Sequence, residues 1–215
     1  MRFDILSLFP QSIAPYLESS ILAIAEDKKL VSYNLHDFRE YATNKHRKVD
    51  DTPYGGGAGM VLSPQPVYDC IQAVKKLNPT AKVLYMSPRG KTLTQSKLKS
   101  LSQQDGFIII CGRYEGLDQR VIDLCVDEEI SLGDFILCGG ELAAMCLVEG
   151  ITRLLPGVLG NPDSPVFESF SPELAGKKKH PVYTKPEEFQ GLRVPDVLLS
   201  GHHKQIQEWQ SDNLS

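Results

Sequence analysis

Residues 82–87, "KVLYMS", and 107–111, "FIIIC", are the two stretches that decide the fold. Both are nearly continuous apolar runs, without the alternation of apolar and polar residues that marks a strand with one solvent-exposed face. Such strands are typical of parallel sheets that helices cover on both faces. The stretch between them, "TQSKLKSLSQQ", has a helical pattern, so strand, helix and strand follow one another. The sequence therefore predicts an α/β fold with a mostly parallel sheet.

The same alternation extends to both sides of this unit. We expect further strands at 3–9, 30–38 and 135–138, and helices at 12–30, 63–77 and 139–155. Ser63 and Pro64 suit the N-cap and first position of the second helix.

The composition of the chain changes at about Pro156. From there on, proline, glycine and charged residues are frequent and the hydrophobic periodicity is lost. We expect a main domain over 1–159, a flexible linker over 160–185 and a short helical C-terminal domain over 186–215. Two short helical pieces flank "VPDVLLSGHH" in the tail. This tail is too small for a core of its own, so it should dock on the main domain or on a second subunit.

Composition narrows the class of protein. The chain has 215 residues, 41% of them hydrophobic, and a formal net charge of −4, which argues against a broad surface that coats nucleic acid. Its five cysteines have no C-x-x-C spacing, so we interpret them as buried free thiols in a reducing compartment. No apolar run approaches the ~18 residues of a membrane span, and we expect a cytoplasmic protein without membrane attachment.

Residues 53–60, "PYGGGAGM", place four glycines within five positions. Clustered glycine favours a loop, which either is a flexible linker or lets a ligand approach the backbone. The stretch "NKHRKVDD" just before it is rich in cations, which suits a polyanion such as RNA.

Three glycine-bearing loops follow predicted strands: "SPRG" at 87–90, "CGRYEGLDQR" at 111–120 and "CGGELAAM" at 138–145. Ligands of open α/β sheets bind beyond the carboxyl ends of the strands, where such loops converge. Each loop alone is more typical of a tight turn, but the three together indicate a pocket.

Eight motifs occur along the chain in this order: "VDDTPYGGGAGM", "SPRG", "CGRYEGLDQRV", "SLGDFILCGGEL", "RLLPGVLGNPDS", "ESFS", "YTKP" and "VPDVLLSGHH". In order and approximate spacing they resemble the motifs of TrmD, the bacterial tRNA (guanine-N1)-methyltransferase family of the SPOUT class. The resemblance covers nearly the whole chain. It implies a SPOUT-type sheet with a C-terminal deep trefoil knot, S-adenosylmethionine as methyl donor, and a homodimer whose active sites take residues from both subunits. The implied activity is methylation of N1 of guanosine 37, on the 3′ side of the anticodon of tRNA.

The resemblance also implies roles for individual residues. The cofactor-binding residues would be Tyr85, Met86, Ser87, Pro88, Gly112, Tyr114, Glu115, Gly116, Leu132, Gly133, Asp134, Phe135, Ile136, Leu137, Gly139 and Gly140. The residues beside the target guanine would be Asp50, Tyr54, Gly55, Gly56, Gly57 and Gly59.

Arg153 matches the family's catalytic arginine, and Glu168 stands where the family has an aspartate as general base. The chain also departs from the family pattern at Ala143, usually proline, and after "IQEW", where an arginine-rich stretch usually follows. Lys177, Lys178 and Lys179 either supply part of that positive charge or form a solvated loop. We expect tRNA binding that is weaker and more sensitive to salt than that of a relative with the arginine-rich stretch.

Two other functions stay open at this point. One is an RNA-binding relative that keeps the cofactor pocket but has little or no catalysis. The other is an α/β enzyme of a different nucleotide cofactor such as NAD, which the missing G-x-G-x-x-G pattern disfavours. No histidine has metal-ligand spacing, so we assign no structural metal, whereas Mg²⁺ could assist through the RNA.

Overall fold

The computed structural model describes residues 1–161 and 164–215. The chain divides into two compact units, Met1–Gly160 and Asn161–Ser215, and each is described by itself. Pro162 and Asp163, which belong to the predicted 160–185 linker, lie outside the described residues.

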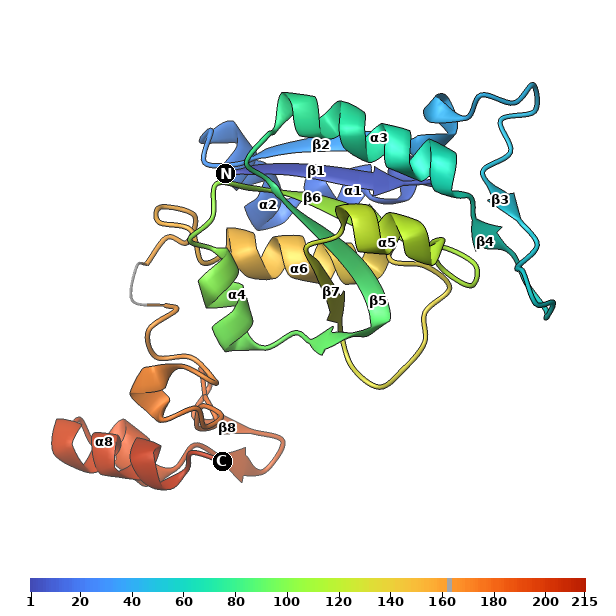
Figure 1. Ribbon diagram of the computed structural model, residues 1–215. Helices are drawn as coiled ribbons and strands as arrows, with labels where there is room; N and C mark the ends of the chain where they lie inside the picture. Colours follow the sequence, from blue (N-terminus) through green and yellow to red (C-terminus); the bar gives the residue numbers. More distant parts are fainter. Residues whose placement is uncertain (162–163) are drawn as a thin grey trace. The chain divides into compact units, whose positions relative to one another are not determined.

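The first unit is built on a five-stranded sheet in the order β2-β1-β6-β5-β7 (Figure 1). All four pairings in this sheet are parallel. The strands are β1 (Arg2–Ser7), β2 (Ser32–Asp37), β5 (Lys82–Thr92), β6 (Gly106–Cys111) and β7 (Glu128–Ser131). The predicted α/β class is therefore confirmed.

Helices cover both faces of this sheet and create two hydrophobic cores (Figure 1). Side chains of a strand alternate between faces, so Phe107, Ile109 and Cys111 enter one core while Ile108 and Ile110 enter the other. The first core is covered by α1 (Ala14–Leu17), α2 (Ser20–Asp27), α4 (Gln95–Leu101) and α6 (Glu141–Thr152). The second is covered by α3 (Pro64–Leu77), α5 (Gln119–Cys125) and the 3₁₀ helix η2 (Phe38–Tyr41).

Some predicted elements are wrong. The single helix expected over 12–30 is divided into η1 (Pro10–Ser12), α1 and α2, and Ser20 at the start of α2 has a φ of +51°. Residues 135–138 are not a strand but part of the exposed loop between β7 and α6. The place beside β5 is taken by β7, whose two glutamates concealed a strand from sequence reasoning. Two of the five cysteines, Cys138 and Cys146, are exposed rather than buried.

Two irregular features position the loops at the carboxyl edge of the sheet. Strands β3 (Asp50–Asp51) and β4 (Val61–Leu62) pair in antiparallel fashion and frame the glycine-rich loop. Ile130 of β7 pairs with both Met86 and Lys91 of β5, so the intervening residues 87–90 bulge out of the strand.

The second unit contains η3 (Pro172–Leu174), β8 (Glu188–Phe189), β9 (Leu192–Arg193), α7 (Asp196–Leu199) and α8 (His203–Asp212). The two helical pieces predicted for the tail are α7 and α8. Within the described part of this unit only Ser171 is buried, so it has no hydrophobic core of its own. Across the described ranges, no helix has the length and apolar character needed to cross a bilayer.

Candidate cofactor and substrate site

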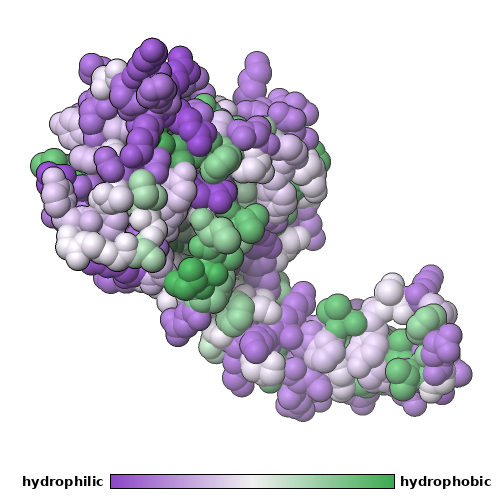
Figure 2. All heavy atoms as spheres, turned by 90° about the vertical axis from the view of Figure 1, so that its right-hand side faces the viewer, coloured by the Kyte–Doolittle hydropathy of each residue, from purple (hydrophilic) through white to green (hydrophobic). Residues whose placement is uncertain are grey.

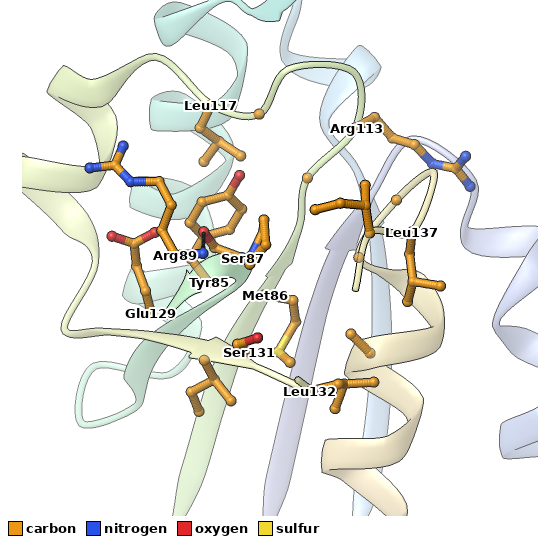
Figure 3. Close-up of a pocket in the computed structure, with 18 of the residues that line it drawn as sticks. Tyr85, Met86, Ser87, Arg89, Arg113, Leu117, Glu129, Ser131, Leu132 and Leu137 are labelled. Atoms are coloured by element: carbon orange, nitrogen blue, oxygen red, sulfur yellow. Dashed lines mark hydrogen bonds between the residues drawn. The ribbon is translucent and has the colours of Figure 1, made fainter. Parts of the chain in front are cut away.

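A cavity of about 260 Å³ lies where the bulge of β5 meets the loops after β6 and β7 (Figure 3). Its volume is just below the ~300–1,000 Å³ of typical small-molecule pockets. The predicted cofactor residues that line it are Tyr85, Met86, Ser87, Pro88, Gly112, Tyr114, Glu115, Gly116, Leu132, Phe135, Ile136, Leu137, Gly139 and Gly140. Gly133 and Asp134, also predicted, are not among the lining residues.

Two of these glycines are required by close packing. A Cβ on Gly112 would lie 2.8 Å from the phenol oxygen of Tyr85, and one on Gly140 would lie 2.9 Å from Cα of Cys111. Gly116 has a φ of +108°, which disfavours any other residue. At Gly112 and Gly140 the space that a side chain would need is thus filled by other parts of the cavity wall.

Sequence reasoning missed several lining residues: Arg89, Arg113, Leu117, Ile122, Glu129, Ile130, Ser131, Cys138 and Ala143. Arg89, Arg113 and Cys138 lie inside motifs that were identified, whereas Glu129 and Ser131 lie on the strand that was not predicted. Their convergence depends on the bulge of β5 and on the pairing with β7, which no local pattern reveals.

A buried polar network supports the loop after β6. Glu141, only 6% exposed, accepts hydrogen bonds from Ser7 Oγ (2.8 Å) and from Arg113 Nε (3.1 Å). The Arg113 guanidinium also lies 4.6 Å from the centre of the Phe9 ring. These contacts join the ends of β1 and β6 to the start of α6, which closes the cavity.

Tyr85 forms the floor of the cavity between two of its loops. Burial raises the pKa of its phenol, and the nearby Glu129 carboxylate raises it further. Tyr85 is therefore neutral at physiological pH and acts through packing and hydrogen bonding.

The glycine-rich loop is joined to the cavity at one end. The amides of Glu115 and Leu62 donate to the carbonyls of Met60 and Gly116, each at 2.9 Å. Gly59 is so close to Glu115 that a Cβ there would lie 2.6 Å from its carboxylate.

The tip of the same loop makes no such contacts. Tyr54 is fully exposed, and a Cβ on Gly55, Gly56 or Gly57 would meet nothing within 4 Å. Asp50, by contrast, is half-buried in β3. Of the predicted substrate residues, Tyr54 and Gly55–Gly57 thus form the exposed tip of the loop, whereas Asp50 lies in the strand before it and Gly59 lies against Glu115.

Arg153 and Glu168, the two predicted catalytic residues, belong to different units. Arg153 is the C-cap of α6 and is half-buried. Glu168 lies just before η3, and its carbonyl accepts a hydrogen bond from the amide of Ser171 (3.1 Å). The amide of Lys179 donates to Ser169 Oγ (3.0 Å), so the lysine stretch packs against the "ESFS" turn.

No group of three or more His, Cys, Asp or Glu side chains within residues 1–161 and 164–215 could hold a metal ion.

A parallel α/β sheet with a glycine-lined cavity at its carboxyl edge is typical of the class of enzymes that bind nucleotide-like ligands. The family model described as "tRNA (Guanine-1)-methyltransferase TrmD" matches residues 1–215. The chain therefore belongs to the TrmD family of tRNA (guanine-1)-methyltransferases.

Individual relatives agree with this assignment. The chain is 51% identical to the tRNA (guanine-N(1)-)-methyltransferase of Shouchella clausii over 99% of its own length and 86% of the relative. The enzyme of the same name from Clostridioides difficile is 45% identical, over 99% and 91% of the two chains. The crystal structure of tRNA (m1G37) methyltransferase from Aquifex aeolicus superposes with a TM-score of 0.81 at 42% identity, over 98% and 88% of the two chains.

Proposed function

We propose that this protein transfers a methyl group from S-adenosylmethionine to N1 of guanosine 37 in tRNA. The observation that carries the proposal is the convergence of three separately predicted loops on one cavity, in a chain of the TrmD family. The similar protein from Aquifex aeolicus is a tRNA (m1G37) methyltransferase, whose name specifies the same modified nucleoside.

The residues around the cavity fit S-adenosylmethionine. Gly112 and Gly140 line the cavity together with Leu132, Ile136 and Leu137, whose apolar surface suits a flat base. When bound, S-adenosylmethionine supplies an electrophilic methyl group on a sulfonium centre. The loops of this chain would hold and orient that group.

Guanine N1 carries a proton and becomes nucleophilic only when that proton leaves. We assign proton removal to the Glu168 carboxylate and stabilisation of the charge that develops on O6 to the Arg153 guanidinium. Glutamate has one more methylene than the family's aspartate, which moves the carboxylate by roughly 1 to 1.5 Å unless the backbone of this turn compensates.

The exposed loop with Asp50, Tyr54 and Gly55–Gly57 would receive the target base. A guanine must leave the base stack to reach a methyl donor, at a cost of a few kcal/mol that an unpaired anticodon-loop base reduces. A loop without side chains leaves room for that base, and Tyr54 offers a ring on which it can stack.

The same proposal includes a homodimer. Figure 2 shows a band of hydrophobic residues on one face of the larger unit, between hydrophilic surfaces. Phe135, Ile136 and Leu142 are exposed apolar side chains of this unit, at 53%, 78% and 67% of their full area. Such exposure is typical of a surface that a second subunit covers.

We further propose the family's trefoil knot, with 1–159 as the cofactor domain, 160–185 as linker and 186–215 as part of a tRNA-binding domain in a cytoplasmic enzyme. In support, the chain after β7 returns to the end of β6, where the amide of Gly140 donates to the carbonyl of Gly112. Mg²⁺ would act through the RNA or the guanine O6, without a ligand cluster of the protein.

The test is methyl transfer from labelled S-adenosylmethionine to a tRNA with guanosines at positions 36 and 37. We expect N1 methylation of guanosine 37 that collapses in Glu168→Gln and survives in Glu168→Asp. Glu173→Gln, at an exposed glutamate in the adjacent η3 helix, is the matched control. A native chain that binds cofactor and tRNA but transfers nothing would instead be an RNA-binding relative without catalysis.

A further inference from the structure

One carboxylate oxygen in the wall of the cavity has no hydrogen-bond partner. Oε2 of Glu129 is buried, and it is the only buried side-chain nitrogen or oxygen of the described residues without a partner. An unsatisfied buried acceptor costs on the order of 1–3 kcal/mol, and more when it is charged. Such a group in a ligand pocket indicates that something else satisfies it.

The position of Glu129 is fixed by its backbone. Its Cα is in register with Tyr85 of β5, and a Cβ on Gly90 would lie 2.4 Å from its carbonyl carbon. The bulge at 87–90 therefore lies directly against this part of β7. The backbone of Glu129 is therefore held at this edge of the cavity, whose wall includes its side chain.

The cavity has chemically different ends. In Figure 3, Glu129 lies with Tyr85, Ser87 and Arg89 on one side, whereas Met86, Leu132 and Leu137 lie toward the other. The apolar end suits a purine ring. The end with Glu129 suits the hydroxyl or ammonium groups of a ligand.

Arg89, the nearest cation in this view, does not satisfy the carboxylate. No ion pair joins Arg89 to Glu129 within the described ranges, and Arg89 Nη1 instead donates to Gln119 Oε1 at an exposed site (3.1 Å). An exposed bond to a neutral amide is weak, so Arg89 can move aside. A ligand donor can then reach the buried Oε2 atom.

We propose that Glu129 is a cofactor-positioning residue, whose Oε2 accepts a hydrogen bond from a donor of bound S-adenosylmethionine. This inference rests on the proposed function. Two donors share the required chemistry: the ammonium of the amino-acid part and the hydroxyls of the ribose.

The test is calorimetric titration of S-adenosylhomocysteine into the native protein, Glu129→Gln and Glu128→Gln. Glu128 is the matched control, because it is adjacent in β7 but pairs with Lys97 (2.6 Å) and does not line the cavity. We expect Glu129→Gln to raise Kd about tenfold and Glu128→Gln to leave it unchanged.

Truncated ligands identify the donor. If the ammonium is the partner, Glu129→Gln costs nothing with 5′-methylthioadenosine, which lacks the amino-acid part. If a ribose hydroxyl is the partner, the cost persists with 5′-methylthioadenosine and disappears with its 2′- or 3′-deoxy form.

Two results would overturn the inference. One is an unchanged Kd for every ligand in Glu129→Gln. The other is a loss that is the same for all ligands and accompanied by a lower Tm of the ligand-free protein, which indicates a purely structural role. A native chain that binds no S-adenosylhomocysteine rejects the proposed function as well, whereas a native chain that binds it with the same Kd as Glu129→Gln rejects this inference alone.

Discussion

A Cβ atom on Gly139 would lie 2.3 Å from Nε of Arg113, the nitrogen that donates to Glu141. Gly139 and Arg113 also form a β-bridge, so the loop before α6 and the loop after β6 meet without space for a methyl group. At this point the backbone of one loop packs directly against the other loop. The effect of a side chain added at a glycine therefore depends on whether the neighbouring atoms can move.

Gly140→Ala should damage the cavity more than Gly139→Ala. The new methyl group at 140 would meet Cα of Cys111 and the amide of Gly112, which are backbone atoms, whereas the one at 139 would meet side chains. We expect Gly140→Ala to cost about 1–3 kcal/mol of stability. Thermal unfolding and S-adenosylhomocysteine titration of both variants check this order, and equal effects would contradict it.

The glycine-rich loop should separate substrate binding from cofactor binding. A side chain at Gly56 would enter the open space that we assign to the target base. Gly56→Ala should therefore slow tRNA methylation while the Kd of the cofactor stays unchanged. Gly59→Ala should weaken both, because its methyl group would displace the Glu115 side chain from the cavity. Cofactor titration and single-turnover methylation separate the two effects. A cofactor defect in Gly56→Ala would argue against this division.

Cofactor should protect one of the two exposed cysteines from alkylation. Cys138 lines the cavity, whereas Cys146 lies on the outer face of α6. Burial raises the pKa of Cys70 to about 12 and that of Cys111 well above its usual value, so neither should react. Mass spectrometry after brief alkylation at pH 8 should show that S-adenosylhomocysteine slows modification of Cys138 only. Equal protection of Cys146 would count against a direct effect.

Sequence reasoning succeeded where local rules govern the structure. The buried strands at 82–87 and 107–111 are recognisable because residues covered on both faces must be apolar, and the loops at Gly112 and Gly140 because close backbone contact requires glycine.

Prediction from sequence failed where contacts between distant parts of the chain determine the structure. The run at 135–138 was predicted as a strand, but its apolar side chains line the cavity or face outward, and β7 occupies the place beside β5. Glu129 could not be identified as a lining residue, because only the bulge of β5 and its pairing with β7 bring it to the cavity.

Asp4 should make stability fall in acid. Burial by itself would raise its pKa, but hydrogen bonds from His36, Arg2 and Asn78 outweigh this effect and lower it from 3.8 to about 2. Because the folded-state pKa is the lower one, the contribution is complete above about pH 4 and is lost as the pH falls toward 2.

Urea unfolding of the native protein and Asp4→Asn at pH 5, 4 and 3 measures this contribution. The stability difference should shrink with acidification, by about 2 kcal/mol in total at the acid limit. A difference that is independent of pH would show that the Asp4 carboxylate titrates normally.

The lysine stretch should contribute to tRNA binding through charge. Replacing Lys177, Lys178 and Lys179 by glutamine should weaken binding and lower the slope of log K against log salt by about 2. The double change of Lys75 and Lys76, at the far end of α3, is the control. Fluorescence titration at 50 to 200 mM salt distinguishes the outcomes, and an unchanged slope would show that these lysines are solvated and make no phosphate contact.

The bulge at 87–90 has a consequence for the rate at which ligands bind. Ile130 pairs with β5 on both sides of the bulge. The bulge is therefore held at both of its ends by the sheet and cannot swing open from one end. Its conformational entropy is lost when the protein folds, and little remains to be lost when a ligand arrives. Along this wall, association should be governed by diffusion and side-chain rotation, without waiting for a loop to close.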